Sequence, residues 1–281
     1  MKSILVLTDF SKNAAAAEQY ALDLAVTCGA NLVLFNAYAA RSVPVGNLVV
    51  WPHDTFSSAG LRSLSNLQVR LEDLKARVES LPPGVFRPEI SHSGGEGAVA
   101  ECVRKELDFK QMWMVVMGTR GESSLPQALW GSNVPRVLSV ATVPVLVVPP
   151  GAGHGGIRKI VYATDFRNND SRIINWLKDF CQQNKAVLTL LHVSPVTRSN
   201  LVEKDRGVAG ELPGIAGTGI QVQYFHDSDI LEALRAVERS ADVDLLALMH
   251  RKHGFFEQLF HPGIARGVIR HTPVPVLVFP G

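Results

Sequence analysis

The sequence predicts an α/β protein built from two tandem copies of one doubly wound domain. Short apolar runs alternate with helical patterns along both halves of the 281-residue chain, which is typical of parallel sheets with helices on both faces. The segment Lys2–Phe10 returns as Arg158–Phe166, and Val143–Pro149 returns as Val274–Pro280. We therefore expect each copy to form a five-stranded, mostly parallel, Rossmann-like sheet flanked by helices.

The domain limits follow from the positions of the repeats. The first strand and the fourth strand do not recur at the same distance along the chain. When Met117 is matched to Met249, the distance between the two copies of the fourth strand is smaller than the distance between the two copies of the first strand. The second copy is therefore shorter, between its second and third strands. The linker is Pro149–Gly156, where proline and glycine exclude helix and strand. These features predict domains at 1–150 and 157–281, each long enough for its own core.

The first copy opens with a continuous apolar run at 4–8, as expected for a strand buried on both faces. Ser11 is expected to cap the following helix and Gly29 to end it. Leucine spacing predicts a long amphipathic helix over 64–81, stopped by two prolines. The other elements expected are strands at 32–37, 85–92, 112–117 and 143–148 and helices at 98–107 and 134–140.

A glycine-rich segment follows the predicted fourth strand. Its pattern is Gly118, two residues, Gly121, nine residues and Gly131-Ser132. Glycines let backbone N–H groups approach phosphate oxygens, and a helix start favours anions. Taken alone, the segment also fits ordinary turns. Asp9 at the end of the first strand favours a nucleotide site, because its carboxylate suits ribose hydroxyls or a metal ion such as Mg²⁺ on the phosphates.

These motifs resemble the universal stress protein family in its tandem two-domain form. The resemblance rests on Thr8-Asp9-Phe10-Ser11, the spaced glycines and the closing run 143–148, and it extends over nearly the whole chain. It implies an adenine nucleotide alpha hydrolase-like fold that binds ATP, ADP or AMP. The nucleotide-binding residues that it implies are Leu7, Thr8, Asp9, Ala37, Met117, Gly118, Thr119, Arg120, Gly121, Gly131, Ser132 and Asn133. Arg120 either neutralises phosphate charge or lies in solvent, and Asn133 stands where an apolar residue is also common.

The second copy departs from this pattern in the loop. In the alignment that matches Met117 to Met249, His250 and His253 replace Gly118 and Gly121, Ile264 replaces Ser132, and Gly263 is retained. Imidazole rings would crowd the space for phosphates. The sequence therefore predicts one nucleotide per chain, in the first domain only, although Asp165 is retained after the first strand of the second copy.

The histidines of the second copy offer a different interpretation. His250, His253 and His261, with His192 and His226 at other strand ends, could converge on a metal ion. Their spacing matches no known zinc signature, so histidines that pack on polar neighbours are the preferred interpretation. No metal site and no catalytic residue are assigned from the sequence.

Composition excludes several classes of protein. The net charge of +2, without a basic stripe, gives no reason to expect nucleic-acid binding. No signal peptide or membrane span is evident, and three scattered cysteines indicate a reducing, cytoplasmic setting with small buried thiols.

Three functions remain open. The first is an ATP-binding stress-response or signalling protein, the second a weak ATP hydrolase or phosphotransferase, and the third a nucleotide-independent interaction module. The chain has no P-loop and no second carboxylate that demands a catalytic role. The apolar final strands, 143–148 and 274–279, are expected to pair as an internal pseudo-dimer, and a homodimer of chains stays open.

Overall fold

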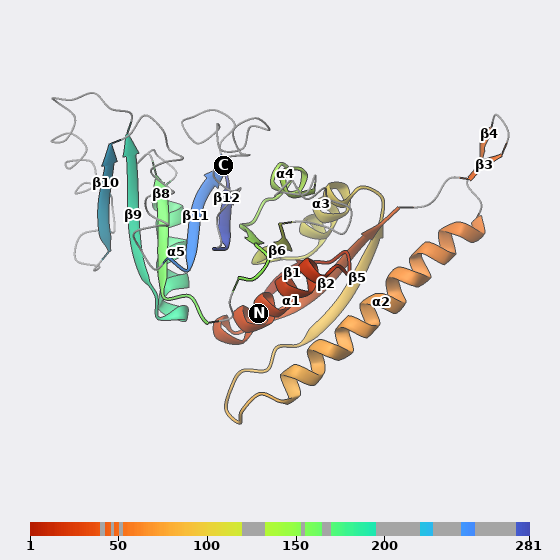
Figure 1. Cartoon of the computed structure of the whole chain (residues 1–281), viewed down its shortest axis with the longest axis horizontal. Coiled ribbons are helices and arrows are strands. Elements are labelled where there is room, and N and C mark those ends of the chain that lie inside the picture. The colour runs from red at the N-terminus through yellow and green to blue at the C-terminus, as the bar shows by residue number, and fades with distance from the viewer. Residues whose placement is uncertain are drawn as a thin grey trace. The chain divides into compact units, whose positions relative to one another are not determined.

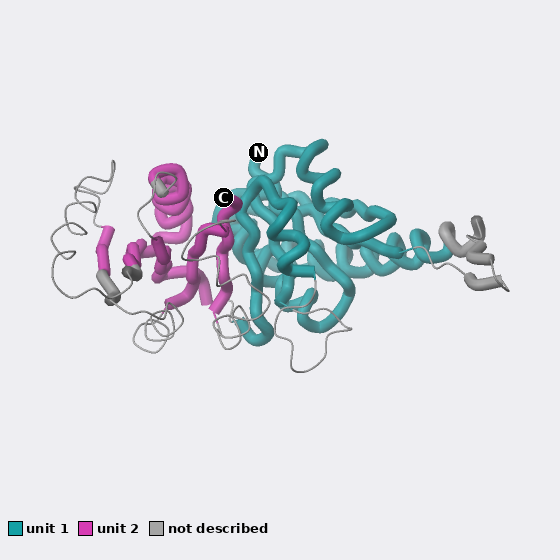
Figure 2. The backbone as a smooth tube through the Cα atoms, turned by 90° about the horizontal axis from the view of Figure 1, so that it is seen from above, with its two compact units in different colours: residues 1–154 teal, residues 155–281 magenta. Residues whose placement is uncertain are grey.

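The structure is a computed structural model. It describes residues 1–39, 43–45, 48–50, 53–119, 133–152, 155–164, 170–194, 220–226, 243–250 and 274–281. The chain divides into two compact units, Met1–His154 and Gly155–Gly281 (Figure 2).

Unit 1 alternates strands and helices in the expected order. Its elements are β1 (Lys2–Leu7), α1 (Lys12–Cys28), β2 (Ala30–Tyr38), β3 (Val43–Val45), β4 (Leu48–Val50), α2 (His53–Glu79), β5 (Ile90–Glu96), α3 (Val99–Phe109), β6 (Met114–Gly118), α4 (Asn133–Leu138) and β7 (Val145–Val148) (Figure 1). The main sheet has the order β7-β6-β1-β2-β5, and every neighbouring pair is parallel.

The order of the strands places β1 in the middle of this sheet. Its residues Ile4, Leu5 and Val6 are fully buried, as an apolar strand between two layers of helices requires. Right-handed crossovers put α1 and α2 on one face and α3 and α4, which contact each other, on the other face. In the sheet, β1 has β2 on one side and β6 on the other, and the connections from β1 and from β6 run to opposite sides. The switch point of the sheet therefore lies between β1 and β6.

Both predicted ends of α1 are confirmed. Ser11 is the N-cap, and its hydroxyl accepts a hydrogen bond from the Ala14 amide at 3.2 Å. Gly29 ends the helix in the left-handed conformation at φ 63°, which glycine adopts without a Cβ clash.

Two elements differ from the prediction by more than two residues in their bounds. The third strand of the main sheet, β5, begins at Ile90 instead of 85, because Pro88 has no N–H to donate and the pairing with β2 starts only at the Glu89 carbonyl. It then continues to Glu96 through two glycines. The long helix α2 begins at His53 instead of 64, and a short hairpin of β3 and β4 precedes it (Figure 1). Trp51 and Pro52 lie outside the described residues.

Unit 2 repeats this architecture. Its described elements are β8 (Lys159–Thr164), α5 (Asp170–Asn184), β9 (Val187–Ser194), β10 (Gln221–His226), β11 (Leu245–His250) and β12 (Val276–Pro280). The strand order β10-β9-β8-β11-β12, all parallel, matches that of unit 1. The predicted fold class, two tandem doubly wound α/β domains, is confirmed.

The three cysteines, Cys28, Cys102 and Cys181, are buried and free, as expected. Burial raises the pKa of the Cys181 thiol to about 11, which keeps it protonated and inert at neutral pH. Across the described segments, no helix combines the length and apolar character needed to cross a bilayer.

Candidate functional site

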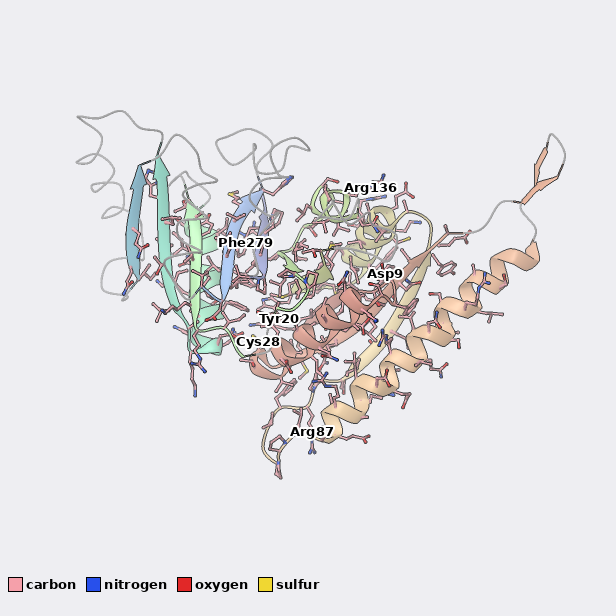
Figure 3. The ribbon with its side chains drawn as sticks, viewed as in Figure 1. Asp9, Tyr20, Cys28, Arg87, Arg136 and Phe279 are labelled. Carbon is pink, nitrogen blue, oxygen red and sulfur yellow. The ribbon has the colours of Figure 1, made fainter. Side chains whose placement is uncertain are left out.

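The candidate site lies where β1 and β6 end side by side. The two strands pair in parallel, with Val6 opposite Val116, so their carboxyl ends share one edge of the sheet. Asp9 follows the end of β1 by two residues, and Gly118 is the last residue of β6. Figure 3 shows Asp9 just before the start of α1, with Cys28 at the other end of that helix. Ligands of doubly wound sheets bind at this position.

Asp9 lies in a tight turn that leads directly into α1. Its Oδ1 accepts a hydrogen bond from the Ser11 amide at 3.1 Å, and its side chain is exposed. This local bond gives the carboxylate a defined direction. A carboxylate offers about four lone-pair sites, so it can accept several hydrogen bonds at once.

Gly118 lets the first turn of α1 approach β6 closely. A Cβ at this position would lie 3.2 Å from the carbonyl oxygen of Asn13 and 3.4 Å from its carbonyl carbon. Both neighbours are backbone atoms of a capped helix, so they cannot rotate away as a flexible side chain would. A larger residue would push the first turn of α1 away by a few tenths of an ångström, so glycine favours this close packing independently of any phosphate.

Thr119 provides a buried polar group at the end of β6. Its amide donates to the Val148 carbonyl at 3.0 Å, which continues the pairing with β7. Its hydroxyl oxygen is buried and has no hydrogen-bond partner within the described segments. A buried hydroxyl without a partner costs about 1–3 kcal/mol, so a ligand atom that bonds to it would recover that energy.

The structure separates the other predicted residues into three groups. Leu7, Thr8 and Met117 are buried, so their side chains belong to the core or to internal hydrogen bonds and only their backbone suits a ligand. Ala37 is half-buried near the end of β2, and Asn133 is exposed at the first residue of α4. Arg120, Gly121, Gly131 and Ser132 lie outside the described residues.

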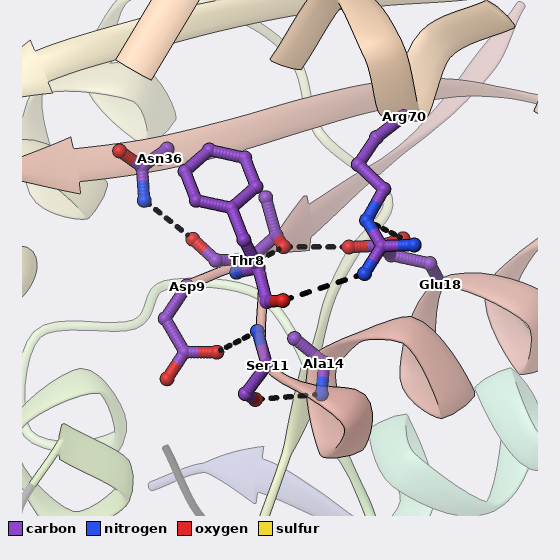
Figure 4. A network of polar contacts seen from close by, with 8 residues as sticks. Thr8, Asp9, Ser11, Ala14, Glu18, Asn36 and Arg70 are labelled. Atoms are coloured by element: carbon purple, nitrogen blue, oxygen red, sulfur yellow. Dashed lines mark hydrogen bonds and ion pairs between the residues drawn. The ribbon is translucent and has the colours of Figure 1, made fainter. Parts of the chain in front are cut away.

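Sequence reasoning missed a buried polar network beside Asp9 (Figure 4). The Thr8 hydroxyl donates to Glu18 Oε1 at 2.5 Å and accepts from the Phe10 amide at 3.0 Å. Arg70 Nε lies 3.7 Å from Glu18 Oε2. The Asn36 side-chain amide donates to the Thr8 carbonyl at 2.7 Å.

The sequence contained a signal for this network. Glu18 stands at helical spacing between the apolar residues Ala14 and Ala21, on the face of α1 that the pattern assigns to the core. A carboxylate on such a face requires buried partners. The identity of those partners, Thr8 and Arg70, depends on the packing of α2 and could not be inferred from spacing alone.

Burial raises the pKa of the Glu18 carboxyl above its usual value of 4.5, while the Thr8 hydroxyl and the Arg70 guanidinium offset part of that rise. The folded protein therefore holds this proton more tightly than the unfolded chain does. The resulting stabilisation is complete below about pH 4.5 and is lost as the pH rises through the raised pKa.

Replacing Glu18 by glutamine is expected to increase stability at neutral pH relative to the wild type. Glutamine keeps an oxygen acceptor for Thr8 but never carries the buried charge, so the free energy of unfolding of the variant minus that of the wild type should grow from about pH 4 to pH 8. Urea unfolding at each pH measures this difference. Glu72→Gln, at an exposed carboxylate of α2, is the matched control for the loss of a carboxylate, and a difference for Glu18→Gln that does not change with pH would contradict the assigned burial cost.

The strand registers correct the alignment of the two copies after the third strand. In unit 1 Ile4 pairs with Met114, and in unit 2 the equivalent Ile160 pairs with Leu245. Leu245 is therefore the counterpart of Met114, whereas the predicted alignment matches Met114 to Leu246. The last two strands of each unit pair in the same corrected register. The second copy is thus shorter than predicted by one further residue.

In this register the counterpart of Gly118 is Met249, and His250 corresponds to Thr119. The predicted match of His250 to Gly118 is wrong by one residue. The strands before and after the loop, β6 and β7 in unit 1 and β11 and β12 in unit 2, are separated by the same number of residues in both units, so the loop has the same length in both copies. Gly121, Gly131 and Ser132 then correspond to Lys252, Pro262 and Gly263, and the predicted matches of His253 and Ile264 shift in the same way. Lys252, His253, Pro262, Gly263 and Ile264 lie outside the described residues, as do Asp165 and His261.

The second copy therefore departs from the first more completely than predicted, because none of the three glycines has a glycine counterpart. Met249 is only 4% exposed, so a full side chain is packed where unit 1 has none. Ile174 is the counterpart of Glu18 and is buried, so the charged centre of the polar network is also missing from unit 2.

His192 has a structural role in unit 2. Its Nδ1 lies 3.1 Å from the Thr164 carbonyl, as the Asn36 amide lies against the Thr8 carbonyl in unit 1. It thus takes the place of Asn36, which accounts for this histidine without a metal. Where side chains are described, no three His, Cys, Asp or Glu residues gather closely enough to hold a metal ion.

Comparison with known proteins agrees with this architecture. The model of the universal stress protein family matches twice, over residues 1–149 and 156–280. A universal stress protein of Synechocystis is 25% identical, and the match covers 99% of this chain and all of that protein. The crystal structure of a universal stress protein from Archaeoglobus fulgidus has a TM-score of 0.74 at 17% identity, over 99% of this chain and 98% of that one. A putative universal stress protein from Pseudomonas aeruginosa gives a TM-score of 0.60 at 18% identity, over 100% and 93%. The chain belongs to the universal stress protein family, with one family domain in each half.

Proposed function

We propose that unit 1 binds one adenine nucleotide, ATP or its products ADP and AMP, and that the chain acts as a stress-response or signalling binder. One observation carries the proposal: Asp9, Gly118 and the buried Thr119 hydroxyl lie at two neighbouring strand ends of a doubly wound sheet. A carboxylate, a backbone position without a Cβ and a hydroxyl are groups that suit ribose and phosphate.

Each group has a distinct role in this proposal. The Asp9 carboxylate, oriented by the Ser11 amide, accepts hydrogen bonds from ribose hydroxyls. The Thr119 hydroxyl donates to an oxygen of the ligand and so gains the partner that it lacks within the described segments. The glycines at 121 and 131 allow backbone amides to approach the phosphates. No described group is placed as a base for hydrolysis, which favours a binder over an enzyme.

We propose that only unit 1 binds nucleotide because unit 2 lacks the glycines of the loop. Met249 fills the position of Gly118, and in the corrected register the loop that follows has also lost the other two glycines of the motif. Unit 2 is proposed to serve as a structural and interaction domain. We also propose that the final strands of the two copies associate within one chain, since β7 and β12 each end the strand order of their own unit.

Isothermal titration with ATP tests the proposal. The wild type should bind about one nucleotide per chain, and Asp9→Ala should weaken binding about 10- to 100-fold, the loss expected for charge-assisted hydrogen bonds. Asp165→Ala, the equivalent change in the second copy, is the matched control and should leave the titration unchanged. Two equal sites per chain, or equal losses in the two variants, would contradict the proposed asymmetry.

A further inference from the structure

A chain of polar contacts joins the long helix α2 to the turn that carries Asp9. Arg70, on α2, donates from Nη2 to the Phe10 carbonyl at 3.4 Å and approaches Glu18 with Nε at 3.7 Å. Glu18 in turn accepts a hydrogen bond from the Thr8 hydroxyl. Figure 4 shows Arg70 reaching from α2 toward Glu18 and the turn. One guanidinium therefore contacts both the backbone after Asp9 and the carboxylate that holds the residue before it.

The turn needs this support because Phe10 adopts an unfavourable conformation. Its φ is 66°, in the left-handed region that bulky residues rarely occupy, at a cost of about 1–3 kcal/mol. Two contacts offset the cost: the Phe10 amide donates to Thr8, and its carbonyl accepts from Arg70. Asp9 lies between the two residues that are held, so the direction of its carboxylate depends on them.

A second branch reaches the turn from the same helix. The Ser63 hydroxyl donates to Asn36 Oδ1 at 2.7 Å, and the Asn36 amide donates to the Thr8 carbonyl. Ser63 and Arg70 are seven residues apart, which places both on one face of α2. Ser63 is buried, and the Arg70 side chain is 28% exposed. The helix is thus linked to the turn at two points along its axis, directly through Arg70 and indirectly from Ser63 through Asn36.

Among its described residues, the second copy retains only the strand-end contact of the second branch. His192 preserves the Asn36 contact with the strand-end carbonyl, but buried Ile174 replaces Glu18. The charged branch therefore occurs in the copy that keeps the glycine loop and is missing from the copy that has lost it. This association links the Glu18–Arg70 branch to the nucleotide site and not to the fold, which both copies share.

We propose that Arg70 is a positioning residue of the nucleotide site, which holds the Asp9–Phe10 turn in its binding conformation and couples nucleotide occupancy to the docking of α2. The inference rests on the proposed function. By thermodynamic linkage, if docked α2 favours nucleotide binding, bound nucleotide must favour docked α2 by the same factor. Helix α2 is then the element that reports occupancy to a partner.

The test combines ATP titration with amide hydrogen exchange. In the wild type, saturating ATP should slow exchange in α2 over residues 58–79 as well as in the turn. Arg70→Met should weaken ATP binding about tenfold, and at saturating ATP its α2 should exchange as fast as without ligand. Arg70→Lys keeps the charge but cannot span both acceptors, and it should restore only part of the affinity. Arg77→Met, on the exposed face of α2, is the control and should behave as the wild type.

The outcomes separate the two proposals. If the wild type binds ATP but α2 exchange does not respond, or if Arg70→Met keeps full affinity, the coupling is refuted and the proposed function stands. If Arg70→Met lowers only the free energy of unfolding, Arg70 is structural and the inference fails. If the wild type binds no ATP even at millimolar concentration, the proposed function fails, and the inference falls with it.

Discussion

Replacing Gly118 by methionine, the residue that unit 2 carries in the corrected register, is expected to lower ATP affinity at least about tenfold. It should also lower the free energy of unfolding by about 1–3 kcal/mol, the usual cost of overpacking. A Cβ at this position already lies 3.2 Å from the Asn13 carbonyl oxygen. The first turn of α1 must therefore move away from β6, and it carries the Asp9 turn with it.

Titration and urea unfolding of the same preparation measure both effects. Gly118→Ala should give a smaller loss in each, because only the Cβ is added. Gly155→Met is the matched control, since a Cβ at Gly155 meets no atom within 4 Å and its backbone is not left-handed. Full ATP affinity in Gly118→Met would show that the close approach of α1 and β6 is unimportant for the site.

The fold could be predicted because its signals are local and repeated. The apolar run at 4–8, Ser11 and Gly29 each specify one feature of the βα unit, and the same pattern recurs in the second half. The prediction was wrong where a local pattern admitted two interpretations. Val85 and Phe86 look like a strand, but Pro88 removes a donor, and the chain pairs with β2 only beyond it.

The alignment of the two copies shows why register needs structure. Met117 and Met249 are both methionine and both precede the loop, so an alignment from sequence alone matches these two residues. Both strands are apolar throughout, and a shift by one residue leaves such a pattern almost unchanged. The backbone pairing with the neighbouring strands makes Leu245, and not Leu246, the counterpart of Met114. This correction strengthens the expectation that unit 2 does not bind nucleotide.

The network around Glu18 could not be predicted for a different reason. Arg70 and the Phe10 carbonyl are separated by 60 residues in the sequence, and no spacing rule connects a helix face to a backbone carbonyl so far away. Residues that directly follow a strand, such as Asp9, can be identified from the sequence. Glu18 and Arg70 could not be, because they support the turn from α1 and α2 through hydrogen bonds to Thr8 and to the Phe10 carbonyl.

Truncating Phe180 to alanine is expected to destabilise unit 2 strongly without affecting ATP binding. Phe180 is 1% exposed on α5 and stacks on Trp176 at 5.1 Å between ring centroids, and Trp176 meets Phe279 edge-on at 5.2 Å. Loss of a buried phenyl ring costs about 3–5 kcal/mol. Urea unfolding should show this loss, while ATP titration below the transition should still give one site per chain with unchanged affinity.

Phe35→Ala is the matched control, because Phe35 is 2% exposed on β2 of unit 1 and its carbonyl accepts from the Thr8 amide. This variant should lose a similar free energy of unfolding but should also weaken ATP binding, since it loosens the strand end beside Asp9. At about 100 times the dissociation constant, ATP should stabilise unit 1 of the Phe180→Ala protein against unfolding by about 2.7 kcal/mol, as it does unit 1 of the wild type. If the Phe180 change weakens ATP binding as much as the Phe35 change, unit 2 contributes to the site, and the assignment of nucleotide binding to unit 1 alone is wrong.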